Sequence, residues 1–349
     1  MQTRTTRKTD HIQFALETGQ SGHNGFADVL FVPNCIPQTK FDQISLMTTF
    51  GGLKLSSPIV INAMTGGAVD TLEINRRLAS LAREAKLTMA VGSQMAAIKD
   101  PSVSDFYTIV RKVNPEGIIF ANLGSEATVD QAKQAVEMIE ADGLQIHLNV
   151  MQELIMPEGD RDFRGSLERI FEIAQALTCP VIVKEVGFGM SWECAKELTT
   201  TGIRGLDLGG SGGTNFALIE NKRRDIPLAM LNDWGMTTVQ SLLEMSLLEA
   251  PFDCMATGGI SDGGQIAKAL ALGARAVGMA GFFLRLVSQH TEEKAYPIVV
   301  DLENQLRLIM TSLGARNIHE LQETPLVIEG KTYHWATQRG IDCRKWSQR

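Results

Sequence analysis

The chain has 349 residues and a formal net charge of -7, and apolar residues make up 44% and charged residues 21% of it. This balance is typical of a folded globular protein, and charges of both signs are mixed along the chain, which argues against a nucleic-acid or membrane-surface partner. The N-terminus lacks the apolar stretch of a secretion signal, and no apolar run approaches the ~18 residues of a membrane span. The five cysteines lie far apart, so the cytoplasm is the expected location.

Residues 1–57 show little regular periodicity and are expected to form an N-terminal extension. Eight short runs rich in Val, Ile and Leu follow, and most of them begin between 23 and 37 residues apart. This spacing accommodates one strand and the crossover helix that a parallel partner strand requires. The runs are Pro58–Met64, Thr88–Ser93, Gly117–Gly124, Gly143–Asn149, Pro180–Gly187, Gly205–Gly210, Asp253–Gly259 and Ala276–Gly281.

Segments between the runs have helical patterns. Leu72–Ala85 and Asp130–Ile139 repeat apolar residues at i, i+3 and i+4, as amphipathic helices do. The longer interval between Gly205 and Asp253 predicts an insertion after the sixth strand, a place where loops commonly carry function.

Eight such units favour an α/β fold, a (β/α)₈ TIM barrel over residues 58–312 within one domain, followed by a C-terminal extension at 313–349. An open doubly wound sheet is the alternative, because periodicity alone does not show that a sheet closes. In a barrel, the functional site forms at the C-terminal ends of the strands.

Three glycine-rich or small-residue turns follow the late strands, at Gly209–Asn215, Thr257–Gly264 and Met279–Phe282. Glycine lets backbone N–H groups approach one anion closely, and phosphate binding after the late strands is a recurring barrel feature. No Walker motif or G-x-G-x-x-G fingerprint is present, which argues against ATP and Rossmann-type NAD binding. The turns therefore predict a phosphate ligand, with tight turns that bind nothing as the alternative.

Lys184 lies at the end of the fifth run, where a buried ammonium needs an anionic partner. A Schiff-base role, a counter-ion for an electron-rich flavin edge and a salt bridge to Glu185 all fit this position.

His147 and Asn149 alternate on the fourth run and therefore share a face at the predicted rim.

Gln152 and Glu153 follow the fourth run directly, and a carboxylate beside a diphosphate can hold Mg²⁺. A single Glu is more often a charge at a helix N-terminus.

Near the start of the chain, Arg7, Lys8 and His11 form a basic cluster. Such a cluster usually belongs to a solvated end, but it could hold a diphosphate if it folded over the barrel mouth.

Eight segments, in order along nearly the whole chain, closely resemble those of type 2 isopentenyl diphosphate isomerases. The sixth strand departs from some relatives by ending on Gly209 rather than Ser. The segments are NAMTGG (Asn62–Gly67), AVGSQM (Ala90–Met95), ANLGSEA (Ala121–Ala127), QIHLNVMQE (Gln145–Glu153), MPEGDR (Met156–Arg161), VIVKEVGFGMS (Val181–Ser191), GTNF (Gly213–Phe216) and the R-K-x-x-H start.

The resemblance implies a barrel enzyme that converts isopentenyl diphosphate to dimethylallyl diphosphate. Its implied cofactors are FMN in the reduced form, Mg²⁺, and NADPH as reductant, and its implied assembly is a homo-oligomer, a tetramer or octamer. The implied FMN contacts are Ala63, Met64, Thr65, Ser93, Asn122, Lys184, Thr214, Gly258, Gly259, Ala280 and Gly281. The implied substrate contacts are Arg7, Lys8, Ser93, Gln94, Met95, His147, Asn149 and Gln152, with Glu153 on Mg²⁺.

This reaction adds a proton at C4 and removes one from C2, so positive charge must be stabilised away from water. The resemblance implies that reduced flavin faces this charge and that its N5 region supplies and accepts protons. Lys184 would then balance the anionic ring, and Gln152 would relay a proton at the opposite end of the substrate, which makes these two the expected catalytic residues.

Three other functions share some of these features. An FMN-dependent 2-hydroxy-acid oxidase shares the barrel and the strand-five lysine, but it needs a His and an Arg near strand seven, where this chain reads ISDGGQ. An enzyme similar to inosine-monophosphate dehydrogenase needs a nucleophilic Cys after strand six, and none is present there. A non-catalytic phosphate-binding barrel fits the glycines but gives the polar rim residues no shared purpose.

Overall fold

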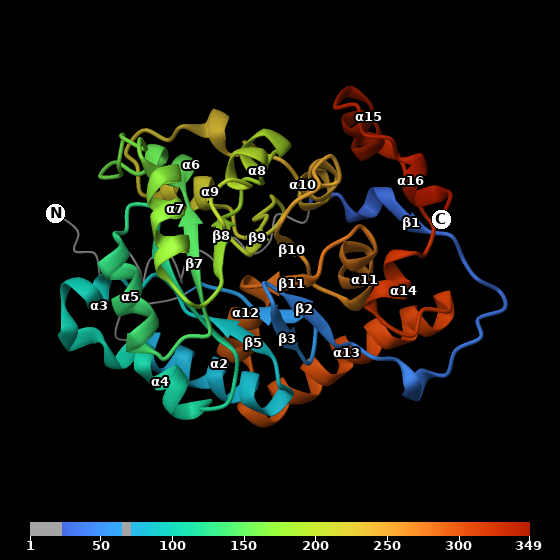
Figure 1. Ribbon diagram of the computed structural model, residues 1–349, viewed down its shortest axis with the longest axis horizontal. Coiled ribbons are helices and arrows are strands. Elements are labelled where there is room, and N and C mark those ends of the chain that lie inside the picture. The colour runs from blue at the N-terminus through green and yellow to red at the C-terminus, as the bar shows by residue number, and fades with distance from the viewer. Residues whose placement is uncertain (1–22, 65–70) are drawn as a thin grey trace.

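The computed structural model describes residues 23–64 and 71–349. Eight parallel strands form a closed barrel in the order β10-β11-β4-β5-β6-β7-β8-β9 (Figure 1). Each strand lies within one of the eight predicted runs, and closure confirms the barrel and excludes the open doubly wound sheet. The strands are β4 (Ile59–Ile61), β5 (Thr88–Ala90), β6 (Ile119–Gly124), β7 (Gly143–Leu148), β8 (Val181–Glu185), β9 (Gly205–Asp207), β10 (Asp253–Thr257) and β11 (Ala276–Met279).

Helices connect the strands and cover the outside of the barrel (Figure 1). Both predicted helices are confirmed, as α2 and α5, and α5 begins at a capping box formed by Thr128 and Gln131. The helices are α2 (Thr71–Ala85), α3 (Met95–Lys99), α4 (Asp105–Val113), α5 (Val129–Met138), α6 (Val150–Ile155), α7 (Ser166–Ala176), α8 (Trp192–Leu198), α9 (Phe216–Lys222), α10 (Thr238–Met245), α11 (Gly263–Ala271), α12 (Gly281–Gln289) and α13 (Glu292–Leu313).

The insertion predicted after the sixth strand is present. It contains α9 and the short 3₁₀ helix η4 (Ala229–Leu231), and it leads into α10. Three further 3₁₀ turns are η1 (Phe26–Asp28), η2 (Phe41–Gln43) and η3 (Pro101–Val103).

An antiparallel hairpin of β2 (Thr48–Phe50) and β3 (Leu53–Leu55) packs against the N-terminal end of the barrel. Phe50 and Leu55 are buried in one apolar cluster with the inward-facing residues Phe120 and Ile182. The hairpin turn is held by the Gly51 N–H, which donates to Asp253 Oδ2 at 2.9 Å. Apolar packing therefore fills this end of the barrel, and the opposite end is the one that can take a polar ligand.

The described part of the N-terminal extension packs on the C-terminal one. Strand β1 (Val29–Phe31) pairs antiparallel with β12 (Leu326–Ile328), and Asp28 Oδ2 accepts bonds from the Thr332 N–H and hydroxyl at 2.9 and 2.7 Å. In Figure 1, β1 lies beside the helices that end the chain. These are α14 (Ile318–Gln322), α15 (Gly330–Gln338) and α16 (Arg344–Ser347).

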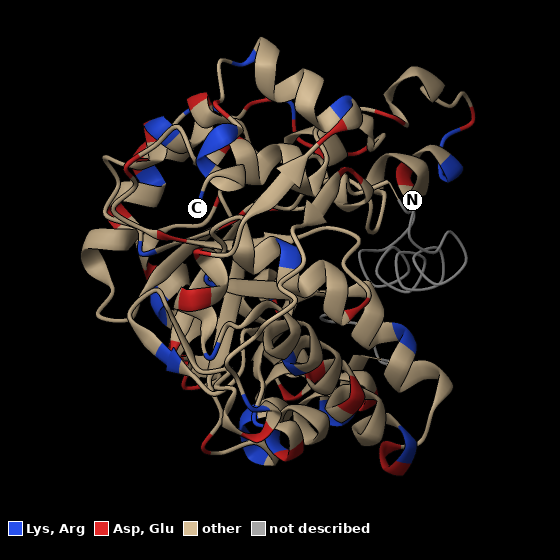
Figure 2. Cartoon of the chain, turned by 90° about the vertical axis from the view of Figure 1, so that its right-hand side faces the viewer, with Lys and Arg blue, Asp and Glu red and all other residues tan. Residues whose placement is uncertain are grey.

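The surface carries charges of both signs. In Figure 2, Lys and Arg residues are interspersed with Asp and Glu residues over the helices in view. No helix in the described residues is long and apolar enough to cross a membrane.

Inside the barrel, the inward-facing residues change from apolar to polar two residues further along several strands. Successive side chains of a strand point to opposite faces, so residues two apart share the interior. The polar member of each pair lies nearer the C-terminal end and is buried. The pairs are Val60 and Asn62, Phe120 and Asn122, Ile182 and Lys184, and Met255 and Thr257.

Candidate active site

A cavity of about 580 Å³ opens at the C-terminal ends of the barrel strands. This size is within the range of small-molecule and cofactor sites. Most predicted site residues of the described chain line this cavity, although they come from every part of the barrel. The predicted residues in its lining are Ala63, Met64, Ser93, Met95, Asn122, His147, Asn149, Gln152, Glu153, Lys184, Thr214, Gly258, Gly259, Ala280 and Gly281.

Four predicted residues are not in this set. Arg7, Lys8 and Thr65 lie outside the described residues. Gln94 is described, but its side chain is fully buried beside α5, where Nε2 donates to the Ala135 carbonyl at 2.9 Å and Oε1 accepts from the Asn122 N–H at 3.0 Å. The Gln94 side chain is therefore turned away from the cavity, because two backbone groups already use both ends of its amide. The predicted substrate contact at Gln94 stays a prediction.

Lys184 has its anionic partner on the neighbouring strand. Its Nζ lies 3.2 Å from Asp207 Oδ2, and it also donates to the Glu185 carbonyl at 2.8 Å. Both side chains are buried, and strand pairing places Lys184 directly beside Asp207. The salt bridge to the Glu185 side chain, one of the three possibilities from the sequence, gives way to this pair.

The Glu185 carboxylate faces the loop that follows β8 and not Lys184. Its Oε2 accepts bonds from the N–H groups of Gly187 and Phe188, both at 2.6 Å, and from Gly189 at 3.2 Å. Burial raises the pKa of Glu185 to about 7, and the backbone N–H groups and Lys184 oppose that rise. Glu185 thus holds the loop that follows Lys184 in place.

Asp207 receives several donors besides Lys184. Asn62 Nδ2 donates to Oδ2 at 2.6 Å, and the Thr257 hydroxyl and the Gly209 N–H donate to Oδ1. A buried carboxylate is tolerated when it is paired and fully hydrogen-bonded. Lys184 is consequently held at the base of the cavity, with its position determined by the strands on either side.

The late glycine-rich turns pack backbone against backbone. A Cβ on Gly258 would lie 1.9 Å from the Gly210 carbonyl oxygen, and one on Gly259 would lie 2.4 Å from the Gly212 oxygen. Both glycines also have a positive φ, which L side chains rarely adopt. A side chain at either position would force these two turns apart.

Helix α12 begins at the same rim of the cavity. Its N-cap residue, Ala280, offers no side-chain hydrogen bond to the first turn, and Ala280 and Gly281 both line the cavity. An uncapped helix N-terminus beside small residues is a suitable site for a phosphate group. Together with the cationic Lys184 across the cavity, these residues fit the phosphate and the electron-rich ring edge of FMN.

Gln152 faces the cavity from α6, and its amide is oriented from behind. Nε2 donates to Glu220 Oε1 at 3.0 Å, and Glu220 is fully buried and ion-paired with Arg223. Because an ionised carboxylate only accepts hydrogen bonds, Gln152 turns its nitrogen to Glu220 and keeps its carbonyl oxygen for a ligand.

Glu153 lines the outer part of the cavity. Its Oε1 accepts from Asn149 Nδ2 at 2.8 Å, and its Oε2 accepts from the Asp160 N–H at 2.9 Å. The described residues contain no group of three or more His, Cys, Asp or Glu side chains arranged to hold a metal ion. A cation here would thus need oxygens from its ligand or from water, as Mg²⁺ commonly does.

The sequence did not predict four residues that shape the site, which are Asp207, Asn62, Gln145 and Glu220. A signal existed for Asp207, since an acidic residue inside a strand run needs a cationic partner, and Lys184 occupies the preceding strand. Glu220 lies on a helix of the insertion, and nothing in its local pattern distinguishes it from a solvated charge.

The sequence of this chain is similar to those of known proteins. A family profile described as FMN-dependent dehydrogenase matches residues 110–328. Isopentenyl-diphosphate delta-isomerase of Bacillus cytotoxicus is 54% identical over 347 residues, covering 99% of each chain. The enzyme of the same name from Bacillus pumilus is 52% identical over 348 residues, covering 99% of this chain and 98% of its own.

Solved structures with the same fold are more distant in sequence. A flavocytochrome b2 double mutant with pyruvate bound has a TM-score of 0.71 at 18% identity, over 91% of this chain and 82% of that one. A mandelate oxidase mutant with an FMN adduct has a TM-score of 0.62 at 13% identity, over 92% and 93% of the two chains. At these identities the likeness concerns the fold.

Proposed function

Because this chain belongs to the isopentenyl-diphosphate delta-isomerase family, we propose that it converts isopentenyl diphosphate to dimethylallyl diphosphate at the cavity described above. The observation that carries the proposal is the arrangement of Lys184, Gln152 and the α12 N-terminus around one cavity. The full-length identity to enzymes of that name supports it.

FMN is the cofactor that fits this cavity, and the match to the FMN-dependent dehydrogenase profile supports it. When bound, reduced FMN supplies an electron-rich ring and exchangeable protons beside the substrate. Lys184 would neutralise the anionic edge of the ring, and the backbone N–H groups near Gly258, Gly259, Ala280 and Gly281 would bind its phosphate.

The protein side chains bind the substrate and exclude water from the reacting carbons. His147 and Asn149 line the cavity from the end of β7, where they can contact the diphosphate, as the basic start of the chain can. Gln152 presents its carbonyl oxygen, which can stabilise positive charge on the substrate and accept a proton in transit. Glu220 keeps it in that orientation at 3.0 Å.

We further propose that Glu153 binds Mg²⁺. We expect Glu153→Gln to raise the Mg²⁺ concentration needed for half-maximal activity and the KM for isopentenyl diphosphate, because the amide lacks the charge that a divalent cation requires. Mg²⁺ titrations of the two proteins measure this. Glu172→Gln is the control, since that residue makes the same chemical change at an exposed position outside the cavity lining. An unchanged titration in Glu153→Gln contradicts the assignment.

The proposal has three further parts. NADPH reduces the flavin, the protein assembles as a homo-oligomer, and it is located in the cytoplasm. The five scattered cysteines, all free, are compatible with a reducing compartment. Sedimentation of the purified protein measures the assembly.

The decisive experiment incubates the purified protein anaerobically with FMN, NADPH, Mg²⁺ and isopentenyl diphosphate. Formation of dimethylallyl diphosphate over many turnovers, with only trace NADPH consumed, is the expected result, because the reaction has no net redox change. Stoichiometric NADPH consumption would instead favour an FMN-dependent oxidoreductase. The solved structures with this fold make that alternative plausible by fold. A 2-hydroxy-acid oxidase, however, needs a His and an Arg in the loop after β10, and residues 260–265 contain neither.

A further inference from the structure

A continuous chain of buried side chains links Asp207 to His147 across the barrel interior. Asn62 Nδ2 donates to Asp207, and Gln145 Nε2 donates to Asn62 Oδ1 at 2.9 Å. Asn122 Nδ2 donates to Gln145 Oε1 at 3.2 Å, and Asn122 Oδ1 lies 2.9 Å from His147 Nδ1. The chain joins inward-facing residues of β6, β7 and β9 with Asn62, which directly follows β4.

The direction of this chain is determined at its start. Asp207 acts as an acceptor, because it is paired with the Lys184 ammonium and also faces the Gly209 N–H, and both of these groups can only donate. Asn62 must then turn its nitrogen toward Asp207. An independent contact agrees: the Ala63 N–H, which can only donate, lies 2.9 Å from Asn62 Oδ1.

The same direction passes to the other end. With Asn62 Oδ1 as acceptor, Gln145 presents its nitrogen there and its oxygen to Asn122. Asn122 then presents its oxygen to His147 Nδ1, so that nitrogen must carry a proton. The neutral imidazole consequently has its lone pair on Nε2, which gains a proton only when the ring becomes a cation.

We propose that Gln145 is a positioning residue that transmits the hydrogen-bond direction from Asp207 and fixes His147 as the Nδ1–H tautomer. Gln145 is fully buried and does not line the cavity within the described part of the chain. In the described residues its side-chain hydrogen bonds go to Asn62 and Asn122, so its effect on the cavity passes through these two amides.

The consequence for binding rests on the proposed function, in which the ligand is a diphosphate. A neutral His147 offers a lone pair at Nε2 and repels a phosphate oxygen, whereas the imidazolium donates a hydrogen bond to it. The KM for isopentenyl diphosphate should thus rise as His147 loses its proton. The charged side chains that line the cavity are Lys99 on α3, Asp100, Glu126 after β6, Glu153 on α6, Glu158, Asp160 and Asp162 between α6 and α7, Arg169 on α7, and Lys184 on β8.

Two substitutions of nearly equal shape at one position test the inference. Gln145→Met removes both hydrogen bonds and frees the Asn122 amide to rotate. Gln145→Glu retains an oxygen for Asn122 Nδ2 in either protonation state, so it preserves the Asn122 orientation. A merely structural role predicts similar behaviour of the two variants, because both disturb the same packing.

The measurement is ¹⁵N NMR of the FMN-loaded protein labelled at histidine, with the His147 signal assigned by its loss in His147→Gln. We expect the Nδ1–H tautomer in the native protein and in Gln145→Glu, and a shift toward the Nε2–H tautomer in Gln145→Met. In Gln145→Met the KM should also depend less on pH, since the neutral ring can then donate through Nε2.

A native protein with the Nε2–H tautomer, or an unchanged tautomer in Gln145→Met, overturns the inference. If Gln145→Met does not fold, an altered tautomer in Gln145→Glu overturns it, and a retained one supports it. The NMR result needs no substrate, so it remains decisive even if the protein does not act on isopentenyl diphosphate.

Discussion

Lys184 and Asp207 form the buried ion pair on which the base of the cavity depends. Their side chains are 10% and 0% exposed, and the two charged atoms are 3.2 Å apart. Removing one partner of a buried pair leaves the other charge without compensation, which is more destabilising than replacing both. The pair therefore has a structural role that can be measured separately from any role in cofactor binding.

We expect Lys184→Met to lower the free energy of unfolding of the cofactor-free protein by about 3 kcal/mol, because Asp207 remains buried without its cation. The variant should also lose FMN, since no charge is left to balance the anionic ring. Urea unfolding measures the first effect, and the flavin absorbance that remains after gel filtration measures the second.

The double variant Lys184→Met with Asp207→Asn separates the two effects. It should recover most of the stability, because no uncompensated charge remains, but it should not recover FMN binding. Full flavin retention in this double variant would contradict the assigned role of Lys184.

Glu185 gives the protein a titration near neutral pH. Burial raises its pKa from 4.5 to about 7 in the folded state, so between these values the folded protein keeps a proton that the unfolded chain has released. The contribution of this group to stability is complete below about pH 4.5 and is lost as the pH rises through about 7.

We expect the difference in unfolding free energy between the native protein and Glu185→Gln to change across this window and to be constant above it. The amide keeps an oxygen for the N–H groups of Gly187 and Phe188 but does not titrate. Urea unfolding at several pH values measures the difference. Parallel curves from pH 5 to 8 would show that Glu185 titrates elsewhere.

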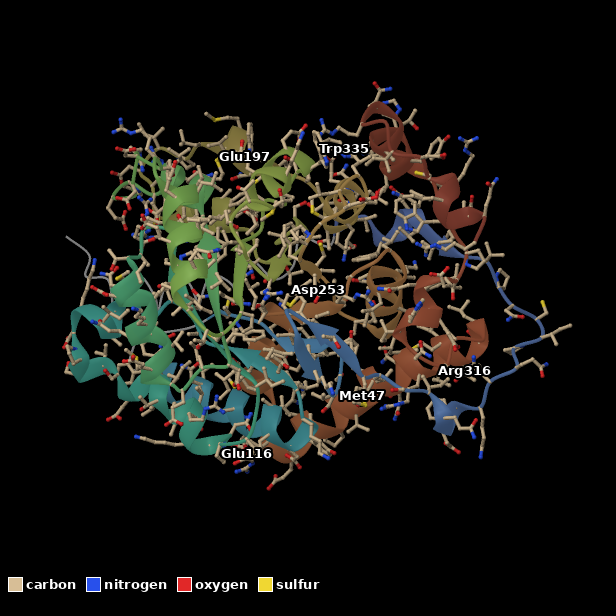
Figure 3. The ribbon with its side chains drawn as sticks, in the orientation of Figure 1. Met47, Glu116, Glu197, Asp253, Arg316 and Trp335 are labelled. Carbon is tan, nitrogen blue, oxygen red and sulfur yellow. The ribbon has the colours of Figure 1, made fainter. Side chains whose placement is uncertain are left out.

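At the scale of elements, Glu244 on α10 anchors the C-terminal extension. It is fully buried, and its carboxylate accepts bonds from Trp335 Nε1 at 3.0 Å and Arg339 Nε at 2.8 Å, both on or next to α15. Figure 3 shows Trp335 on this helix, near α10. The extension thus docks through one buried acceptor as well as through the pairing of β1 with β12.

Glu244→Ala should lower the free energy of unfolding by about 2 to 3 kcal/mol, because the indole N–H of Trp335 and the guanidinium of Arg339 lose their partner. Glu193 also pairs with Arg339, but its side chain is 53% exposed, and Glu193→Ala should cost much less than Glu244→Ala, because solvent screens an exposed pair. Urea unfolding of the two variants compares these costs. Equal losses would contradict the anchoring role of Glu244.

At the scale of the whole molecule, the cavity joins loops from all around the barrel, so a ligand that fills it should stabilise the entire fold. FMN at about 100 times its Kd should add about 2.7 kcal/mol to the free energy of unfolding. Thermal unfolding with and without FMN measures this.

Gly258→Ala should remove most of that gain, because its Cβ would meet the Gly210 oxygen at 1.9 Å and separate the two turns that we propose bind the phosphate. Gly273 has the same φ of 116° but no atom within 4 Å of a Cβ. Gly273→Ala therefore carries the backbone strain alone and should keep the full FMN effect. If both variants keep it, the two turns do not bind the phosphate.

The sequence by itself determined the eight strands, the helices α2 and α5 and the insertion, because alternation, helical periodicity and strand-to-strand spacing are local properties of the chain. It also placed Lys184, His147, Asn149 and the late glycine turns at one rim, since the C-terminal end of every parallel strand must lie there. The other predicted cavity residues came from the resemblance to the isomerase family. That Lys184 needed an anion followed from burial alone.

Only the tertiary structure decided which anion that was, and which way each side chain points. Closure of the barrel brings Asn62 on one strand end to Asp207 and Gln145 on others, 145 and 83 positions away in the chain. Packing of α5 turns the Gln94 side chain away from the cavity, although Ser93 and Met95 line it. Hydrogen-bond partners across a barrel depend on strand register and closure, and these properties have no signature in any local segment of sequence.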